Sequence, residues 1–176
     1  MKSALKPFTI VLFLMALATF SKAQDIPKID EGNLVTQLMG LSSLNQVQAD
    51  SYLTGKQYAV SSKSTKSLGA YDADFIKYKL SGGTDSYSIV LVKGKIINTM
   101  YITYSKDIYL KAVDDALKAG FKVTEAANPD PAQTVYAMGD TRFIVRTNNA
   151  KDKTFYVLGL SNLVVTAKAI AEVKSK

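Results

Sequence analysis

The sequence predicts an α+β fold in which a mainly antiparallel sheet, built of meanders, is covered on one face by helices. The first observation is the segment Phe75–Tyr104, where three strand-like runs are separated by two glycine-bearing turns. The second is Ser105–Ala119, whose apolar residues recur at helical spacing. The third is a return of strand-like runs after Phe121. A three-stranded meander needs a covered face to be stable, so we expect helices to pack on it.

The first 23 residues are predicted to be a secretory signal peptide. Two lysines precede an uncharged, mostly apolar run, Phe8–Phe20, and Ser21 and Ala23 supply the small residues that a signal peptidase reads. The alternative is a membrane anchor, but 13 residues are too few for a spanning helix, which needs about 20. Residues 24–176 are therefore expected to form one exported domain, periplasmic or secreted, with no transmembrane anchor after cleavage.

Composition removes several classes of function. The chain has no cysteine and no histidine, which excludes disulfides, thiolate nucleophiles, Cys-based metal sites and every Ser-His or Cys-His catalytic arrangement. Signal cleavage removes three of the 22 basic residues and leaves 19 against 15 acidic ones, a net charge of +4. These lysines are spread thinly, whereas nucleic-acid-binding proteins usually cluster them. We therefore expect no nucleic-acid partner and no cofactor.

The first helical segment follows a polar lead-in. Asn33 is placed to cap a helix, and apolar residues follow it at helical spacing. Gly40 weakens the middle of this pattern, so we expect either one interrupted helix or two short ones, the second over Leu44–Leu53. In this second helix, the side chains expected to face inward are those of Val47, Tyr52 and Leu53.

The strands of the first half come next. A short strand is expected at Gln57–Ser61, followed by a serine- and lysine-rich loop to Leu68. The next strand alternates apolar residues with lysines, which is typical of a sheet with one face in water. Its two faces carry Ile76, Tyr78 and Leu80 on one side and Phe75, Lys77 and Lys79 on the other.

The second half is predicted to begin with the helix at Ser105–Ala119. Its expected buried stripe consists of Ile108, Leu110, Val113, Ala116 and Leu117. Four strands should follow, at Phe121–Ala126, Thr134–Met138, Thr141–Thr147 and Thr154–Leu160, with a proline-containing loop at Asn128–Pro131. The last segment, Leu160–Val173, is compatible with a helix or with a strand continuing from Leu163; the apolar spacing favours a helix.

The order of elements recurs in residues 33–104 and 105–176, which raises the hypothesis of two tandem helix-plus-sheet repeats. Phe75-Ile76 aligns with Phe143-Ile144 at an offset of 68, but an offset of 67 agrees better with the alternation. The alternative is that the two halves of any α+β domain look alike. In organisation the chain is similar to the small secreted inhibitors of the β-lactamase-inhibitor type. Those proteins carry cysteines, which this chain lacks.

Candidate sites are few, and no catalytic, cofactor-binding or metal-binding residue is predicted. Asp72 and Asp74 project from one face of a strand, but the further oxygen ligands of a calcium loop are missing. The Ser81–Thr84 segment resembles a phosphate loop in composition only and is expected to be a hairpin turn. Tyrosines in strands are suited to interfaces. The possible interface residues are Tyr87, Tyr101, Tyr104, Tyr136 and Tyr156.

Three functions remain open. The first is an exported, non-catalytic module that binds a protein or an envelope component through a sheet face. The second is a small envelope-acting hydrolase that uses carboxylates or a Ser/Lys pair. The third is a carrier of a small apolar ligand, which requires a cavity between the sheet and the helices. Two convergent carboxylates in a concave site would favour the hydrolase, and a shallow, open sheet would count against it.

Overall fold

The structure is a computed structural model that describes residues 27–69, 71–128, 133–150 and 153–174. The predicted signal peptide and the proline-containing loop after Asn128 lie outside these residues. Within the described part of the chain, no helix is both long and apolar enough to cross a membrane.

Four helices and eight strands are described, and they confirm the α+β class. The helices are α2 (Leu34–Ser42), α3 (Gln46–Gly55), α4 (Lys106–Lys118) and α5 (Leu163–Lys174). The first four strands are β1 (Tyr58–Ser67), β2 (Asp72–Leu80), β3 (Ser86–Val92) and β4 (Lys95–Thr103). The second four are β5 (Lys122–Asn128), β6 (Gln133–Met138), β7 (Thr141–Ala150) and β8 (Lys153–Asn162).

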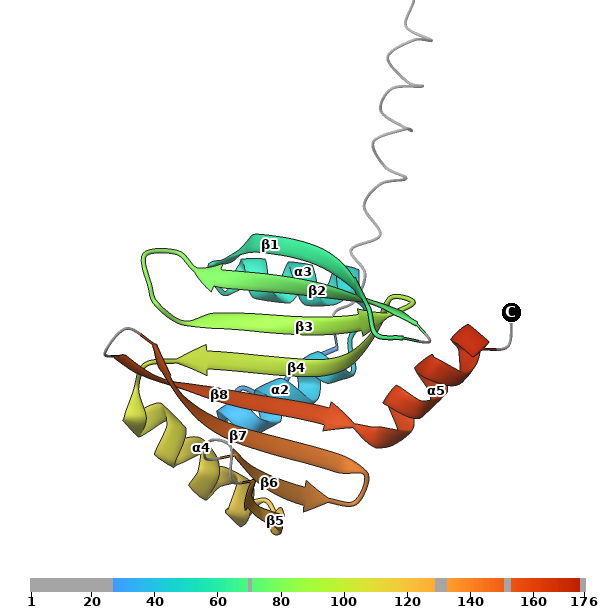
Figure 1. Cartoon of the computed structure of the whole chain (residues 1–176). Coiled ribbons are helices and arrows are strands. Elements are labelled where there is room, and N and C mark those ends of the chain that lie inside the picture. Colours follow the sequence, from blue (N-terminus) through green and yellow to red (C-terminus); the bar gives the residue numbers. More distant parts are fainter. Residues whose placement is uncertain (1–26, 70, 129–132, 151–152, 175–176) are drawn as a thin grey trace, which may run out of the picture.

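All eight strands form one antiparallel sheet in the order β1-β2-β3-β4-β8-β7-β6-β5 (Figure 1). Each group of four consecutive strands is a meander, and α4 connects the two groups. The meanders meet where β4 pairs with β8, from Asn98 opposite Ser161 to Thr103 opposite Tyr156. The middle of the sheet is therefore made of the last strand of each half.

The two faces of the sheet differ in their cover. Helices α2, α3 and α4 pack on one face, where Ile76, Ile89, Phe143 and Leu158 belong to one large buried cluster with side chains of all three helices. On the other face α5 packs at one end only, in a smaller cluster that includes Val92. Figure 1 shows α5 running away from that end of the sheet. We call this second face the open face.

The first helical segment is two helices, which decides between the two predicted alternatives. Asn33 caps α2 and Asn45 caps α3, each in a capping box that satisfies the backbone N–H groups of the first turn. The predicted inward position of Val47 is wrong, because its side chain is 62% exposed. Ala49 and Leu53, one turn apart, form the buried stripe, and Val47 lies about 200° around the helix from Ala49.

The predicted loop after Ser61 is also wrong. It continues the strand β1, which pairs with β2 along its length as far as Ser67 opposite Asp72. This edge strand is exposed at nearly every position, so no apolar alternation marks it in the sequence. Lysine side chains, which β1 carries at Lys63 and Lys66, are common on edge strands because their charge discourages pairing with a further strand.

The buried stripe of α4 agrees with the predicted one in part: Ala116 is buried and Ile108 and Val113 pack against the helix-covered core, as predicted, but Leu110 and Leu117 do not belong to the stripe. Ala112 and Ala116 face the sheet, whereas Leu110 and Leu117 are each 50% exposed on the far side of the helix. The two alanines let the helix axis approach the sheet closely, which the bulkier leucines would prevent. Two ion pairs lie on the exposed side of the helix: Lys111 with Asp115 at 2.7 Å, and Lys118 with Asp114.

The C-terminal segment is the favoured helix from Leu163 onward and not a strand continuing from that residue, but the helix begins three residues later than the predicted start at Leu160. Leu160 lies in β8 and is 1% exposed, and the strand continues to Asn162. The helix α5 then begins at Leu163, and the Asn162 side chain accepts a hydrogen bond from the Val165 backbone N–H. The preceding strand β7 extends to Ala150, beyond the predicted end at Thr147.

Candidate functional site

The alternation of β2 separates its charges between the two faces of the sheet. Ile76 and Tyr78 point to the helix-covered core, and Asp72 and Asp74 share their parity. Lys77 and Lys79 have the opposite parity and are exposed on the open face. One strand therefore presents its carboxylates to one side and its amino groups to the other.

The other charged residues that strands β2, β3, β4, β7 and β8 place on the open face are also positive. In the β-ladder, Lys79 is paired with Ser86 on β3. The same row of paired residues continues across β4 and β8 to Arg146 on β7. Arg142 occupies the same face of β7, where its guanidinium donates to the Gly139 carbonyl at 2.7 Å. Strands β2, β3, β4, β7 and β8 place no carboxylate on this face. The open face is thus a cationic surface.

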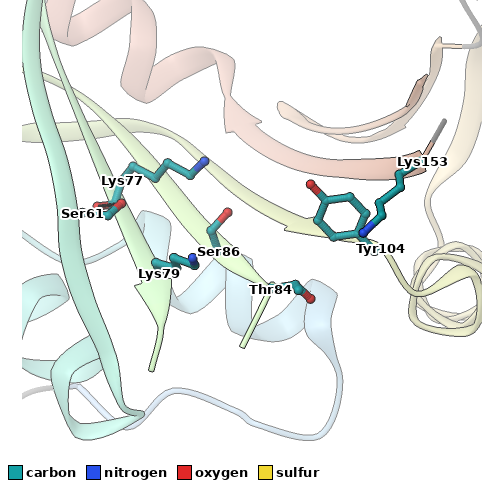
Figure 2. Close-up of a pocket in the computed structure, with 7 residues that line it drawn as sticks. All are labelled: Ser61, Lys77, Lys79, Thr84, Ser86, Tyr104 and Lys153. Atoms are coloured by element: carbon teal, nitrogen blue, oxygen red, sulfur yellow. Dashed lines mark hydrogen bonds between the residues drawn. The ribbon is translucent and has the colours of Figure 1, made fainter. Parts of the chain in front are cut away.

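A pocket of about 440 Å³ lies on the open face, at the end of the sheet opposite α5. We call it the basic pocket; its lining residues are Ser61, Lys77, Lys79, Thr84, Ser86, Tyr104 and Lys153. Figure 2 shows the two lysines of β2 on one side and Tyr104 with Lys153 on the other. Ser86 lies between them and is 3% exposed, whereas the Tyr104 side chain is 48% exposed.

The chemistry of the basic pocket suits an anion. Three of its lining residues are lysines and the other four carry hydroxyl groups, and no carboxylate lines it among the described residues. None of the ion pairs in the described part of the chain involves Lys77, Lys79 or Lys153. Lysine amino groups and hydroxyl groups together donate hydrogen bonds to oxyanions.

The same pocket brings a serine and a lysine together, the pair that the hydrolase alternative requires. Ser86 and Lys79 are directly opposite each other in the β2–β3 register, so a Ser/Lys pair is placed side by side. No hydrogen bond joins their side chains, and Lys79 is exposed to solvent. A lysine that activates a serine must be desolvated and within hydrogen-bond distance of it. In the described geometry, Lys79 is thus not placed to activate Ser86.

A second pocket, of about 400 Å³, lies between the sheet and the helices on the opposite face. We call it the tyrosine pocket; its lining residues are Leu34, Gln37, Tyr52, Lys56, Tyr58, Leu80, Tyr87, Tyr101 and Ile108. The ring of Tyr87 packs between Tyr58 and Tyr101, with centroid distances of 4.9 Å to each. A carrier of a small apolar ligand would need a cavity in this position, between the sheet and the helices.

The hydroxyl groups of the tyrosine pocket are bonded within the protein. Tyr87 donates to the Gln37 side chain at 3.2 Å, and Tyr101 donates to the Asp85 carboxylate at 2.6 Å. Burial, followed by the nearby Glu31 carboxylate, raises the pKa of Tyr52 to about 12. Burial also raises the pKa values of Tyr87 and Tyr101, and the Asp85 hydrogen bond adds to the effect on Tyr101. These tyrosines stay neutral well above neutral pH.

The five predicted interface tyrosines lie in three places. Tyr87 and Tyr101 line the tyrosine pocket and are 5% and 7% exposed. Tyr136 and Tyr156 are buried on the helix-covered side, where Tyr156 stacks on Tyr109 of α4 at 4.5 Å. Tyr104 alone among the five is an exposed ring, and it lines the basic pocket. Their use as an interface stays a prediction, which Tyr104 is best placed to serve.

The other residues considered as sites have local structural roles. Asp74 accepts a hydrogen bond from the Thr65 hydroxyl at 2.6 Å, across the β1–β2 pair. The described residues contain no cluster of three or more side chains able to hold a metal ion. The Ser81–Thr84 segment is the turn between β2 and β3, as expected, and Thr84 contributes to the basic pocket.

Sequence reasoning missed Ser61, Ser86 and Lys153 as members of a site. The alternation of β2 identified the wet face that carries Lys77 and Lys79, but Lys153 comes near them only through the β4–β8 pairing. No sequence signal marks that pairing. Comparison with protein-family models, with curated proteins and with solved structures finds no match, so the geometry of the open face carries the functional argument.

Proposed function

We propose that the protein is an exported, non-catalytic module that binds an anionic component of the cell envelope through the open face of its sheet. Export rests on the predicted signal peptide in residues 1–23. The observation that carries the binding role is the separation of charge in β2, which places Lys77 and Lys79 on the open face and the carboxylates on the other.

The spacing of the cations indicates an extended partner. Lys79 and Arg146 are separated by four strand-to-strand steps, which at about 4.8 Å each gives about 19 Å. A small inorganic anion cannot touch both, whereas a polyanion can. A surface of one sign attracts a partner of the opposite sign from a distance, and this attraction weakens as salt is added.

The tyrosine pocket favours a second candidate, a carrier of a small ligand. Its volume of about 400 Å³ is within the range of ligand sites, about 300 to 1,000 Å³. It ranks second because the carrier considered from the sequence takes an apolar ligand, whereas Gln37, Lys56 and four tyrosines supply most of the lining of this pocket. An apolar ligand there would lie against polar groups that it cannot satisfy.

The test measures binding of residues 24–176 to polyglutamate and to polyphosphate, two general polyanions, at low and at physiological salt. The Lys77→Glu/Lys79→Glu variant should weaken binding about tenfold or more at low salt, because it reverses two charges in the site. The matched control is Lys106→Glu/Lys118→Glu, which makes the same charge change on exposed positions of α4.

Equal weakening by the two double variants would show that only net charge matters, and would overturn the proposal. Failure of the unaltered protein to bind either polymer at low salt would overturn it as well. Capture from the native envelope fraction then identifies the partner, with the Lys77→Glu/Lys79→Glu variant as the matched negative.

A further inference from the structure

The basic pocket is larger than a site for a simple oxyanion. Its volume of about 440 Å³ is within the range of pockets that enclose small organic ligands. Its positive groups are on two sides, with Lys77 and Lys79 from β2 facing Lys153 from β8 (Figure 2). A ligand that fills this space therefore carries, besides its charged group, an uncharged part about the size of a ring, which lies between the lysines.

The hydroxyl groups of the pocket match a polyhydroxylated body. Thr84, Ser86 and Tyr104 can each donate one hydrogen bond and accept others. The Ser61 hydroxyl donates to the Lys77 backbone carbonyl at 3.2 Å, so it has only acceptor capacity left for a ligand. Such a lining recognises groups that both donate and accept, as sugar hydroxyl groups do.

Tyr104 supplies a flat apolar wall. Its ring packs against Phe155, with centroids 6.1 Å apart, which supports it on one side. It remains 48% exposed, and Figure 2 shows it beside Lys153 at the edge of the pocket. An aromatic face next to a cation can stack against the C–H face of a sugar ring while the cation binds the ring's anionic substituent.

The cations of the pocket favour a saccharide over an acidic protein surface. All three are lysines, and lysine is depleted in protein–protein interfaces, where arginine and aromatic residues are enriched. We infer that the basic pocket binds an acidic saccharide, a sugar ring that carries a carboxylate or a phosphate group. This inference rests on the proposed function, because it names the class of anion that the open face takes.

The experiment records amide chemical shifts of residues 24–176 during titration with digalacturonate and with glucose 6-phosphate. Cellobiose provides the neutral comparison, hexaglutamate the acidic peptide and inorganic phosphate the bare oxyanion. We expect the two acidic sugars to shift the amides of Ser86 and Tyr104 and to bind more tightly than the three other probes.

Variants of Tyr104 test the role of the ring. Tyr104→Ala should weaken binding of both acidic sugars about three- to tenfold, because it removes the stacking surface, and Tyr104→Phe should retain most of it. Leu117→Ala, which truncates an equally exposed side chain on α4, should change nothing. Lys77→Ala/Lys79→Ala should weaken binding of the acidic sugars and leave the fold intact, because both side chains are exposed.

The outcomes separate this inference from the proposed function. Hexaglutamate binding as tightly as digalacturonate, with Tyr104→Ala having no effect on either, would overturn the saccharide inference and leave a polyanion-binding module. Inorganic phosphate binding as tightly as glucose 6-phosphate would likewise reduce the pocket to an oxyanion site. If neither the polyanions nor the acidic sugars bind at low salt, both proposals fail.

Discussion

The Tyr101 hydroxyl donates a hydrogen bond of 2.6 Å to the Asp85 carboxylate and thereby joins β4 to the turn between β2 and β3. Asp85 also accepts, through its backbone carbonyl, a 3.0 Å hydrogen bond from the Leu80 N–H, which closes that turn. One residue thus fixes the hairpin that carries Thr84 of the basic pocket and Leu80 of the tyrosine pocket.

Tyr101→Phe should lower the free energy of unfolding by about 1–2 kcal/mol. The change removes a hydrogen bond to a charged acceptor and leaves the ring packing intact. Urea titration measures the difference. Tyr104→Phe, at an exposed tyrosine, is the control and should stay within about 0.5 kcal/mol of the parent protein. Equal midpoints for the two variants would contradict a structural role for the Tyr101–Asp85 bond.

Stability should fall at alkaline pH. Tyrosines of the tyrosine pocket have folded-state pKa values above the ordinary value of 10.0, chiefly because of burial. The contribution of these neutral tyrosines to the free energy of unfolding is therefore complete below about pH 10. It is lost as the pH rises through their folded-state pKa values. Urea midpoints measured between pH 7 and pH 11.5 should be level at first and then decline.

The absence of tryptophan makes this titration direct to follow, since tyrosine ionisation is then read without indole absorbance. Tyr87→Phe removes one of the groups with a raised pKa, so the decline should be shallower in that variant. A midpoint that stays constant from pH 9 to pH 11.5 would show that these hydroxyl groups are not buried as described.

Leu53 and Val47 of α3 should differ strongly in their effect on stability. Leu53→Ala removes a fully buried side chain from the helix-covered core and should cost about 2–5 kcal/mol. Val47→Ala, at a position 62% exposed, should change stability by less than about 0.5 kcal/mol. Thermal or urea unfolding compares the two variants. A similar loss of stability in both would show that α3 is not rotated about its axis as described.

Gly40→Ala should be destabilising even though alanine is the better helix former. A Cβ atom at position 40 would lie 2.7 Å from Cγ2 of Ile29, which is 8% exposed and packs against α2. Overpacking of this kind costs about 1–3 kcal/mol, against a gain of about 1 kcal/mol in helix propensity. The Ile29→Ala/Gly40→Ala double variant should be more stable than the two single effects predict, which a double-mutant cycle in urea measures.

Most of the strands could be predicted because their two faces differ. Ile76 and Tyr78 alternate with Lys77 and Lys79, and this pattern alone identified β2 and its wet face. The pattern fails where both faces are wet, as in β1, whose exposed residues looked like a loop. It also fails where small residues form the contact, because Ala112 and Ala116 of α4 carry less apolar signal than the exposed leucines beside them.

The site was harder to predict than the strands. Tyr104 was among the predicted interface residues, but its neighbours in the basic pocket come from β1, β2, β3 and β8. Which strands become neighbours depends on the packing of the whole sheet, and the strand order is not encoded in any local pattern. Tyr136 and Tyr156 lie in strand-like runs of the sequence, as Tyr104 does. The alternation of side chains along their strands nevertheless directs them to the helix-covered side.

The junction of the two meanders has a consequence for how the chain folds. The residues paired across β4 and β8 are far apart in the sequence, from 53 positions for Thr103 with Tyr156 to 63 positions for Asn98 with Ser161. During synthesis the first meander therefore stays open at its β4 edge until nearly the entire chain has emerged. Contacts of such high sequence separation slow folding, and an unpaired interior strand can pair with other chains. The last strand to be synthesised, β8, is thus the one that joins the two meanders into a single sheet.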